Sequence, residues 1–532
     1  MMRKTYLLCF LVILGLGDSF CGLAAEWQWS VPIKSITSGE TNDHPTAFLW
    51  VPSNCRQIRG VVIGQHNMLE EGILEHQAFR KTLSRLGFAE IWVTPATDMV
   101  FNFKAGAGEV FNEMMDSLAA QSGYQELKFA PVIPIGHSAA ASYPWNFAAW
   151  NPRRTLAILS VHGDAPLTNH TGSGRPNPDW GASNINGIPG LFVMGEYEWG
   201  DQRIAPAMNY VKANPKAPIA YLCDAGHGHF DFSDELVDFL CMFLSKVSKE
   251  RLPKAGPLDK PVVLKAVDPA KGWRVDRWRK DEILKAPSAP YGIYSGAKDE
   301  AGWAFDKQMA TATEKYYASA RGKIRRGIAY AQDGSVLPAS GFEGYKLKFN
   351  PLSDGLTFHV SALLRATSEK SPSVKISRIC GPVIQVNDTT FKVSFYRMGM
   401  ENKKRTNDIW LMATEPGDEK YKSSVQQANL KIPFRNTEGK DQKINFPDIP
   451  AQKAGIRSIK LRAVSDAPVP VSYYIKNGPA EIDGDVLVFT QIPPRAKFPV
   501  KVTVVAWQYG QSQVPKLKTA KAVERTFYIN KT

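Results

Sequence analysis

Short apolar segments alternate with segments of helical pattern over the first half of the chain, from Glu26 to about Leu252. The segments typical of strands are residues 46–51, 60–64, 90–93, 132–135, 155–161 and 191–194, and those typical of helices are 75–86, 109–120 and 236–247. Strands that alternate with helices in this way are joined by crossover connections and lie parallel in one sheet. We therefore predict a doubly wound α/β domain over residues 26–252.

The segment Gly136-His137-Ser138-Ala139-Ala140 stands at the end of one predicted strand and ahead of a segment that can form a helix. A serine held between small residues in such a strand-to-helix turn is how an α/β-hydrolase exposes a nucleophile. The motif alone is weak, but an acid segment and a histidine segment follow it in the chain order that this fold uses. Ser138 is the candidate nucleophile.

A serine hydroxyl becomes nucleophilic when an imidazole takes its proton, and two histidines follow the predicted strand near residue 221. His227 comes directly after Ala225-Gly226 and six residues before Ser233, where a helix is expected to begin. We predict His227 as the base. His229 is the alternative base, or a substrate contact, or a polar loop residue.

The imidazole needs an anion to hold its tautomer, and three carboxylates follow the apolar strand that ends at Gly195. Glu198 lies three residues after that glycine, a position at which α/β-hydrolases commonly carry the acid. We therefore predict Glu198 as the acid. Asp201 and Glu196 are the alternatives, and Asp164, after the preceding strand, is the reserve.

An acyl-transfer site also needs two backbone donors for the oxyanion, one from the residue after the nucleophile and one from the loop after the third strand. Ala139 supplies the first by its position, and we name Asn67, in the segment 64–68, for the second. His66 and Asn67 could equally order that loop through side-chain hydrogen bonds.

The first 25 residues have the pattern of a cleaved secretory signal: the charged pair Arg3-Lys4, an apolar run over residues 6–17 and small residues at the end. The sequence thus predicts an exported protein, periplasmic or secreted, with no transmembrane segment. Cys21 could carry a lipid, but the residues before it, 18–20, lack the usual small side chains.

Four cysteines lie beyond the signal, and they are scattered without the spacing of metal ligands: Cys55, Cys223, Cys241 and Cys380. Export permits disulfides, but small buried thiols are the favoured interpretation. No Cys/His cluster suggests zinc, and we predict neither a metal nor another cofactor.

The second half of the chain has a different pattern. Residues 253–344 are rich in proline and carry one helical stretch, 303–320, so we predict a linker that packs against its neighbours. Short alternating segments then predict a β-rich domain over 345–453 and an immunoglobulin-like β-sandwich over 454–532. The strand candidates are residues 346–349, 357–363, 391–396, 408–413, 459–463, 469–475, 486–489, 500–508 and 525–529.

The net charge of +14 is distributed unevenly. Residues 25–252 carry 17 basic and 23 acidic side chains, a net −6, whereas residues 253–532 carry 46 and 27, a net +19. A basic surface attracts polyanions. Outside the cell these include acidic polysaccharide, anionic lipid and nucleic acid, and a solvated basic face without a partner is equally compatible. We predict an acidic polysaccharide and no nucleic-acid partner.

With these motifs in hand, residues 26–252 resemble the α/β-hydrolase superfamily, and an exported enzyme with trailing β-modules resembles the bacterial carbohydrate esterases. The segments 64–68, 136–140 and 225–230 together are similar to those of a pectin methylesterase family of this fold. The resemblance implies hydrolysis of an ester through an acyl-enzyme, with methyl esters of pectic uronic acids as the expected substrate.

Four residues near the presumed pocket suit such a substrate. Trp180, Tyr197 and Trp199 could stack on sugar rings, and Arg203 could pair with a carboxylate. For the aromatic residues, core or lid packing is the alternative. Two other functions stay open: an acetyl or feruloyl esterase on neutral polysaccharide, and a noncatalytic carbohydrate-binding protein on a hydrolase scaffold.

Overall fold

The structure is a computed structural model, and it describes residues 27–171, 175–280, 282–341, 344–365 and 374–531. The predicted signal over residues 1–25, with Cys21, lies outside the described residues. Within the described ranges, no helix is both long and apolar enough to cross a membrane.

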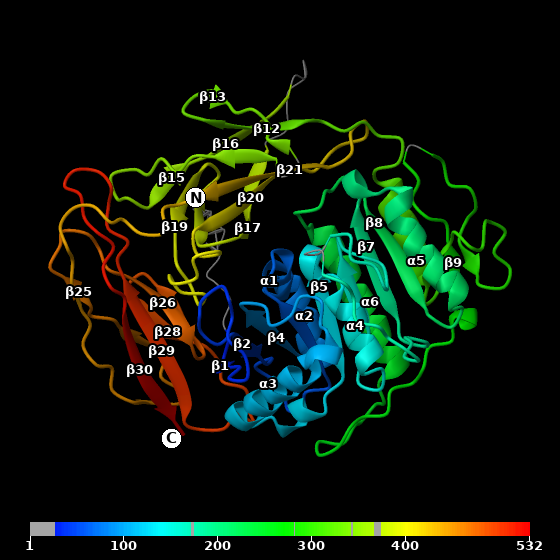
Figure 1. The fold of residues 1–532 in the computed structure, drawn as a ribbon, viewed down its shortest axis with the longest axis horizontal. Helices are drawn as coiled ribbons and strands as arrows, with labels where there is room; N and C mark the ends of the chain where they lie inside the picture. Colours follow the sequence, from blue (N-terminus) through cyan, green and yellow to red (C-terminus); the bar gives the residue numbers. More distant parts are fainter. Residues whose placement is uncertain (1–26, 172–174, 281, 342–343, 366–373, 532) are drawn as a thin grey trace, which may run out of the picture.

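An eight-stranded sheet forms the centre of the N-terminal domain, in the order β1-β2-β4-β3-β5-β6-β7-β8 (Figure 1). The first two strands pair antiparallel, β2 also pairs antiparallel with β4, and all later neighbours are parallel. The strands are β1 (Trp29–Pro32), β2 (Thr46–Trp50), β3 (Gly60–Gln65), β4 (Phe88–Thr94), β5 (Val132–His137), β6 (Ile158–Val161), β7 (Gly190–Gly195) and β8 (Ile219–Asp224). The predicted doubly wound α/β domain is confirmed.

Helices cover both faces of this sheet, which is why its strands are apolar throughout rather than alternating. Val62 of β3 packs into the core that α1, α2 and α6 share, while Val61 and Ile63 pack into the opposite core with α3 and α4. The helices are α1 (Leu69–Leu74), α2 (Gln77–Leu86), α3 (Ala107–Ser122), α4 (Tyr143–Trp150), α5 (Asp201–Ala213) and α6 (Asp234–Arg251).

Two helix starts depend on identifiable caps. The Ser233 hydroxyl accepts a hydrogen bond from the backbone N–H of Leu236 at 3.0 Å, and α6 begins where the sequence predicts it. The predicted helix 75–86 begins two residues late, because the His76 side chain caps it by accepting from the Ala78 N–H at 3.3 Å.

The predicted linker forms a small sheet and a helix that pack on the α/β domain: β9 (Trp273–Val275), β10 (Ala289–Pro290), β11 (Gly302–Ala304) and α7 (Lys307–Ala318). The hydroxyl of Tyr317 in α7 accepts from the backbone N–H of Cys223 in β8 at 3.2 Å. The predicted helix 303–320 is shorter than expected, because its first residues pair with β9 as β11.

Strands dominate the chain after α7. They are β12 (Ile328–Gln332), β13 (Ser335–Val336), β14 (Tyr345–Leu347), β15 (Thr357–His359), β16 (Ser361–Leu364), β17 (Lys375–Cys380), β18 (Val383–Asn387), β19 (Thr390–Val393), β20 (Asp408–Glu415) and β21 (Ser424–Lys431). Since β12 pairs antiparallel with β16, the β-rich part begins before the predicted boundary at residue 345.

The last part of the chain contains a four-stranded sheet, β23-β30-β29-β26, and a three-stranded sheet, β24-β28-β27, around a common core. Its strands are β22 (Ile444–Asn445), β23 (Gln452–Lys453), β24 (Ser458–Lys460), β25 (Val464–Ser465), β26 (Ser472–Asn477), β27 (Ala480–Asp483), β28 (Val486–Phe489), β29 (Val500–Trp507) and β30 (Val523–Asn530). The β-rich character is confirmed, and the immunoglobulin-like arrangement stays a prediction. All four cysteines among the described residues are free and buried, in agreement with the prediction of small buried thiols.

The strands from β12 onward, which we call the β-rich region (residues 324–531), curve around one side of the α/β domain (Figure 1). Buried contacts join the two. The Glu71 carboxylate at the start of α1 accepts from the Tyr396 hydroxyl at 3.1 Å and pairs with Arg378 at 3.5 Å. On another side, Arg495 pairs with Glu126 at 2.7 Å. The β-rich region is therefore packed against the α/β domain.

Candidate active site

Ser138 stands at a sharp turn between β5 and α4. Its φ is +49°, a left-handed value that few residues other than glycine adopt and that α/β-hydrolases hold at their nucleophile. The turn also brings residue 140 back onto residue 136: a Cβ on Gly136 would lie 2.0 Å from the carbonyl oxygen of Ala140. The glycine of the motif is thus required by the turn that presents the serine.

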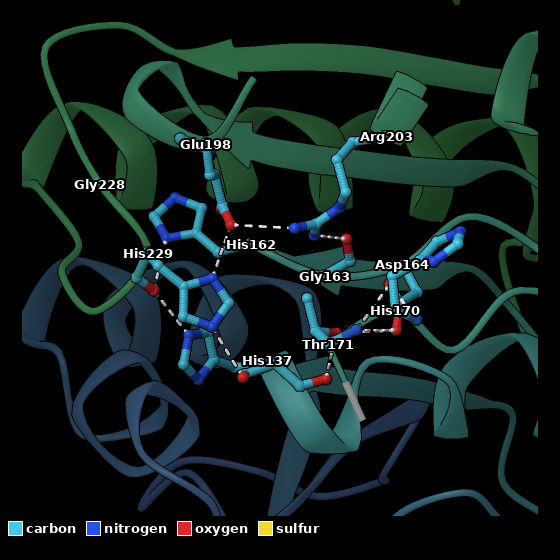
Figure 2. Close-up of polar contacts among 12 residues, drawn as sticks. His137, His162, Gly163, Asp164, His170, Thr171, Glu198, Arg203, Gly228 and His229 are labelled. Carbon is cyan, nitrogen blue, oxygen red and sulfur yellow. Dashed lines mark hydrogen bonds and ion pairs between the residues drawn. The ribbon is translucent and has the colours of Figure 1, made fainter. Parts of the chain in front are cut away.

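His229 connects this serine to an acid. Its Nε2 lies 2.7 Å from the Ser138 Oγ. Its Nδ1 lies 2.7 Å from Oε2 of Glu198 (Figure 2). The two side chains are almost fully buried, with 5% of His229 and 7% of Glu198 exposed. The structure therefore brings together Ser138 and Glu198, as the sequence predicts, through the histidine that the sequence ranked second.

The prediction of His227 as the base needs correction. The Nδ1 atom of His227 lies 2.5 Å from Oδ2 of Asp231, and the side chain does not contact Ser138 in the structure. The chain leaves β8 through a turn at Gly226, whose φ is +85°, and this turn directs His227 toward Asp224 and Asp231. The histidine that faces Ser138 is His229, two residues further along this loop.

His227, Asp224 and Asp231 form a buried cluster whose ligand atoms lie within 4.8 Å of one another, a spacing that could hold a cation. Its carboxylates already have protein donors: Asp231 accepts from the Gly228 N–H at 2.9 Å, and Asp224 accepts from the Tyr316 hydroxyl. Burial alone would lower the pKa of His227, but the two carboxylates outweigh burial and raise it to about 9. The positive charge of the protonated His227 ring can thus balance the two carboxylates, as the charge of a metal ion would.

Glu198 is held in its ionised form. Burial opposes this form, but the hydrogen bond from His229 and the charges of His162 and Arg203 outweigh burial and lower the pKa of the Glu198 carboxyl. The nearest Arg203 nitrogen is 3.6 Å from Oε2, and its Nη2 also donates to the carbonyl of Gly163 at 3.0 Å (Figure 2). An ionised acid is what a histidine needs when it takes a proton from serine.

The structure assigns other tasks to two of the alternative acids. Asp201 begins α5 and pairs with Arg277 at 3.2 Å. Asp164 holds the loop after β6, where it accepts from the Thr171 hydroxyl at 2.7 Å, and that hydroxyl in turn contacts the Ser138 carbonyl at 2.9 Å.

Two further histidines support the loop of His229. The backbone carbonyl of His229 accepts from Nε2 of His137 at 2.8 Å and from Nδ1 of His162 at 3.3 Å (Figure 2). Since a carbonyl can only accept, both of these ring nitrogens carry protons. The other nitrogen of His162 lies 3.0 Å from the Asp224 carboxylate and so also donates.

His137 and His162 therefore differ in charge. With donors on both ring nitrogens, His162 is an imidazolium, and its hydrogen bond to Asp224 raises its pKa against the effect of burial. Burial and the neighbouring imidazoles instead hold the pKa of His137 well below its usual value. His162 also has a positive φ of +43°, an uncommon conformation that recurs at functional sites.

The loop after β3 is tied to the elbow by side chains, as one of the two interpretations of this loop predicts. The Asn67 amide donates to the His137 carbonyl at 2.8 Å, and the Glu70 carboxylate accepts from the His137 N–H at 2.7 Å and from the Met68 N–H at 3.0 Å. Burial raises the pKa of Glu70 to about 7. His66 contacts the Thr94 hydroxyl at 2.9 Å. The backbone donors predicted at Ala139 and Asn67 flank the same junction, and their oxyanion role stays a prediction.

The predicted substrate residues are only partly available. Trp180 is 6% exposed and its indole N–H donates to Asn146 at 2.7 Å, so it belongs to the core. Arg203 contacts Glu198 and the Gly163 carbonyl and so supports the acid, and its pairing with a substrate carboxylate stays a prediction. Tyr197 and Trp199 are partly exposed, and the Arg325 guanidinium lies 3.5 Å from the centre of the Tyr197 ring.

The sequence pattern places His229 second among the candidate bases and assigns no role to His162, although a signal for His162 is present. His162-Gly163-Asp164 follows the end of an apolar strand, on the sheet edge that carries Ser138 and Glu198, and the pattern marks Asp164 there as a candidate acid. For the base, the spacing from strand and helix favoured His227, and the contact of His227 with Asp231 was not visible in the pattern.

The sheet order, the elbow after β5 and the chain order Ser138, Glu198, His229 define an α/β-hydrolase fold for residues 27–252. No protein-family model and no curated protein matches the chain.

Solved structures that match include a thermostable carboxyl esterase from Bacillus coagulans, with 12% identity over 42% of this chain and 100% of that one, at a TM-score of 0.29. A truncated carbohydrate esterase from gut microbiota matches with 12% identity over 43% and 100%, at 0.30. An S-formylglutathione hydrolase from Agrobacterium tumefaciens matches with 13% identity over 43% and 98%, at 0.29. The fold assignment for this chain rests on its own sheet order and elbow.

Proposed function

We propose that the protein is a serine carboxylesterase that removes methyl esters from pectic uronic acids of plant cell-wall polysaccharide. The observation that carries this proposal is the continuous contact from Glu198 through His229 to the Ser138 hydroxyl, at 2.7 Å on both sides of the imidazole. That arrangement suits the activation of a serine for attack on an ester carbonyl.

In the proposed reaction, His229 takes the Ser138 proton while Oγ attacks the ester carbonyl. The backbone N–H groups of Ala139 and Asn67 would stabilise the negative oxygen of the tetrahedral intermediate. Collapse of the intermediate breaks the bond to the methoxy group, which leaves as methanol with the proton from His229. Water, deprotonated by the same imidazole, then releases the uronate from the serine and restores the hydroxyl.

The choice of an acidic polymer is supported by charge. The C-terminal half carries the net positive charge of the chain, and two of its arginines contact residues of the loops after β7 and β3. Arg325 covers one face of Tyr197, and Arg405 donates to the Asn67 carbonyl at 3.3 Å. Unesterified uronates in a partly methylated chain are anions, so these basic side chains would favour their binding next to Ser138.

The test is a comparison of methanol, acetate and ferulate release from pectic and xylan fractions, with the Ser138→Ala protein as the blank. We expect methanol from the pectic fraction, and none from the variant at equal circular dichroism and melting temperature. Acetate or ferulate release without methanol would replace the proposed substrate by the alternative esters. Wild-type turnover in the Ser138→Ala protein would refute the serine mechanism.

A fluorophosphonate probe separates the enzyme from a noncatalytic binding protein on the same scaffold. The wild-type protein should be labelled at Ser138, because the probe reports a serine activated by an imidazole. An unlabelled wild-type protein would contradict catalysis by this site.

A further inference from the structure

Three contacts join the loop after β7, which carries the proposed acid, to the loop after β8, which carries the proposed base. Each contact pairs residues about 30 positions apart, in the same order along both loops. The pairs are Glu196 Oε2 with the Gly226 N–H at 2.8 Å, the Tyr197 N–H with the His227 carbonyl at 3.1 Å, and Glu198 Oε2 with His229 Nδ1 at 2.7 Å. The position of one loop therefore sets the position of the other.

Glu196 is the buried end of this series, and its charge is matched from the β-rich region. Its Oε1 pairs with the ammonium group of Lys422, which precedes β21, and only 2% of the Glu196 side chain and 5% of the Lys422 side chain are exposed. A buried carboxylate without a cation is strongly disfavoured. Lys422 therefore compensates the buried carboxylate of Glu196 on one oxygen while the other oxygen accepts from the Gly226 N–H.

The neighbour of Lys422 touches the same turn. A Cβ on Gly226 would lie 2.2 Å from Oγ and 2.7 Å from the carbonyl oxygen of Ser423. The segment Lys422-Ser423 is thus packed against the backbone at which the base loop leaves β8. The Phe230 ring, next to His229, also lies 5.1 Å from the ring of Trp410 in β20.

We propose that Lys422 is a positioning residue for the proposed esterase: through Glu196 it holds the acid loop and the base loop at the separation that keeps Glu198, His229 and Ser138 in contact. This inference rests on the proposed function of the site. It makes the β-rich region a component of the active site and assigns it a role besides any binding of polysaccharide.

The experiment is the Lys422→Met variant of the full chain, assayed on p-nitrophenyl acetate. Reactive sites are counted with a fluorophosphonate probe, so that kcat refers to folded and labelled molecules only. We expect kcat per labelled site to fall at least tenfold with the KM for p-nitrophenyl acetate within twofold, because the contacts that Lys422 supports align Glu198 and His229 with Ser138. A kcat per site within twofold of the wild type would overturn the proposal.

Two further variants separate positioning from general stability. Arg495→Met removes another cation that joins the two parts of the chain, at Glu126 and away from the catalytic loops, and it should leave kcat per site unchanged. Lys422→Met combined with Glu196→Gln removes both charges but keeps an oxygen for the Gly226 N–H, and it should recover most of the lost kcat. An equal loss in Arg495→Met, or no recovery in the double variant, would contradict a specific role of Lys422.

Hydrogen exchange tests the same contact without activity. In the Lys422→Met protein, the amides of residues 224–229 should exchange faster than in the wild type, while amides of α3 should be unchanged. If the wild-type protein neither hydrolyses esters nor is labelled, the proposed function fails, and the exchange result still decides whether Lys422 holds the loop. Unchanged exchange in residues 224–229 would refute the positioning role.

Discussion

At the scale of single residues, the site uses four buried imidazoles for different tasks. His229 contacts Ser138, His137 donates to the His229 carbonyl while its pKa is held low, and His162 and His227 are cations fixed by carboxylates. The difference comes from their neighbours, because a buried imidazole is charged only where carboxylates outweigh the cost of desolvation. The two cations neutralise Asp224 and Asp231 and leave Glu198 as the partner of His229.

The two histidines of the base loop should therefore respond differently to substitution. We expect His229→Ala to lower kcat on p-nitrophenyl acetate by roughly 10⁴-fold or more, as loss of a triad imidazole does. His227→Asn keeps a donor for Asp231 and should retain most of the kcat while lowering the melting temperature. Steady-state kinetics and thermal unfolding of both proteins measure this, and the reverse pattern would restore His227 as the base.

The raised pKa of His227 also predicts how stability depends on pH. In the unfolded chain an imidazole titrates near pH 6.5, whereas the pKa in the folded protein is about 9. Between these values the folded state binds more protons, so the stabilisation is complete below pH 6.5 and is lost as pH rises through 9. The contribution is on the order of 3 kcal/mol.

Urea unfolding at pH 6 and at pH 9.5 tests this for the wild type and for His227→Asn. The free energy of unfolding of the wild type should decrease more over this interval than that of the variant. Glu70 also has a raised pKa, but it is present in both proteins and its effect cancels in the comparison. Identical pH dependence in the two proteins would show that His227 is not the cation of this cluster.

At the scale of elements, the site is built from loops at the carboxyl ends of neighbouring parallel strands. The loops after β3, β5, β6, β7 and β8 meet there because consecutive parallel strands end at one edge of the sheet. Their conformations depend on close approaches of backbone to backbone, and these fix which positions tolerate a side chain.

Gly226 and Gly228 form a matched pair for testing this. Gly226→Ala should destabilise the protein and lower kcat, because a φ of +85° costs an alanine about 1–2 kcal/mol and its Cβ would meet Ser423 at 2.2 Å. Gly228→Ala should be tolerated, since its Cβ would lie 3.5 Å from the nearest Asp231 oxygen. Thermal unfolding and kcat of the two variants decide, and equal tolerance would mean that the β-rich region does not pack on this turn.

The elements themselves were largely predictable from sequence, and the side-chain partners were not. Apolar strands buried on both faces give a strong local signal, and Ser138 was identified because its glycine and small neighbours follow from the turn. The choice between His227 and His229 depends on where Asp231 lies in space. Lys422 could not be foreseen at all, because it lies 226 positions from Glu196 and nothing local marks its side chain as buried.

At the scale of the whole molecule, the β-rich region lies beside the α/β domain (Figure 1) and carries 32 basic and 18 acidic side chains, a net +14. It reaches the loop that carries Glu198 through Lys422 and the β3 loop through Arg405, while many of its other cations are exposed. Buried cations act at short range and are little screened by salt, whereas exposed ones attract a polyanion over a distance that salt controls. The effects of the buried and of the exposed cations can therefore be distinguished by varying the ionic strength.

Raising the salt concentration from 0.01 M to 1 M shortens the Debye length from about 30 Å to about 3 Å. We expect KM for a partly methylated, anionic pectin to rise several-fold over this range, while kcat and the KM for p-nitrophenyl acetate stay nearly constant. A fully methylated, neutral pectin serves as the matched polymer control, and its KM should not follow the anionic one. If both pectins respond equally to salt, the exposed basic charge does not recruit the substrate, and the loops held by Lys422 and Glu196 would be the main contribution of the β-rich region to catalysis.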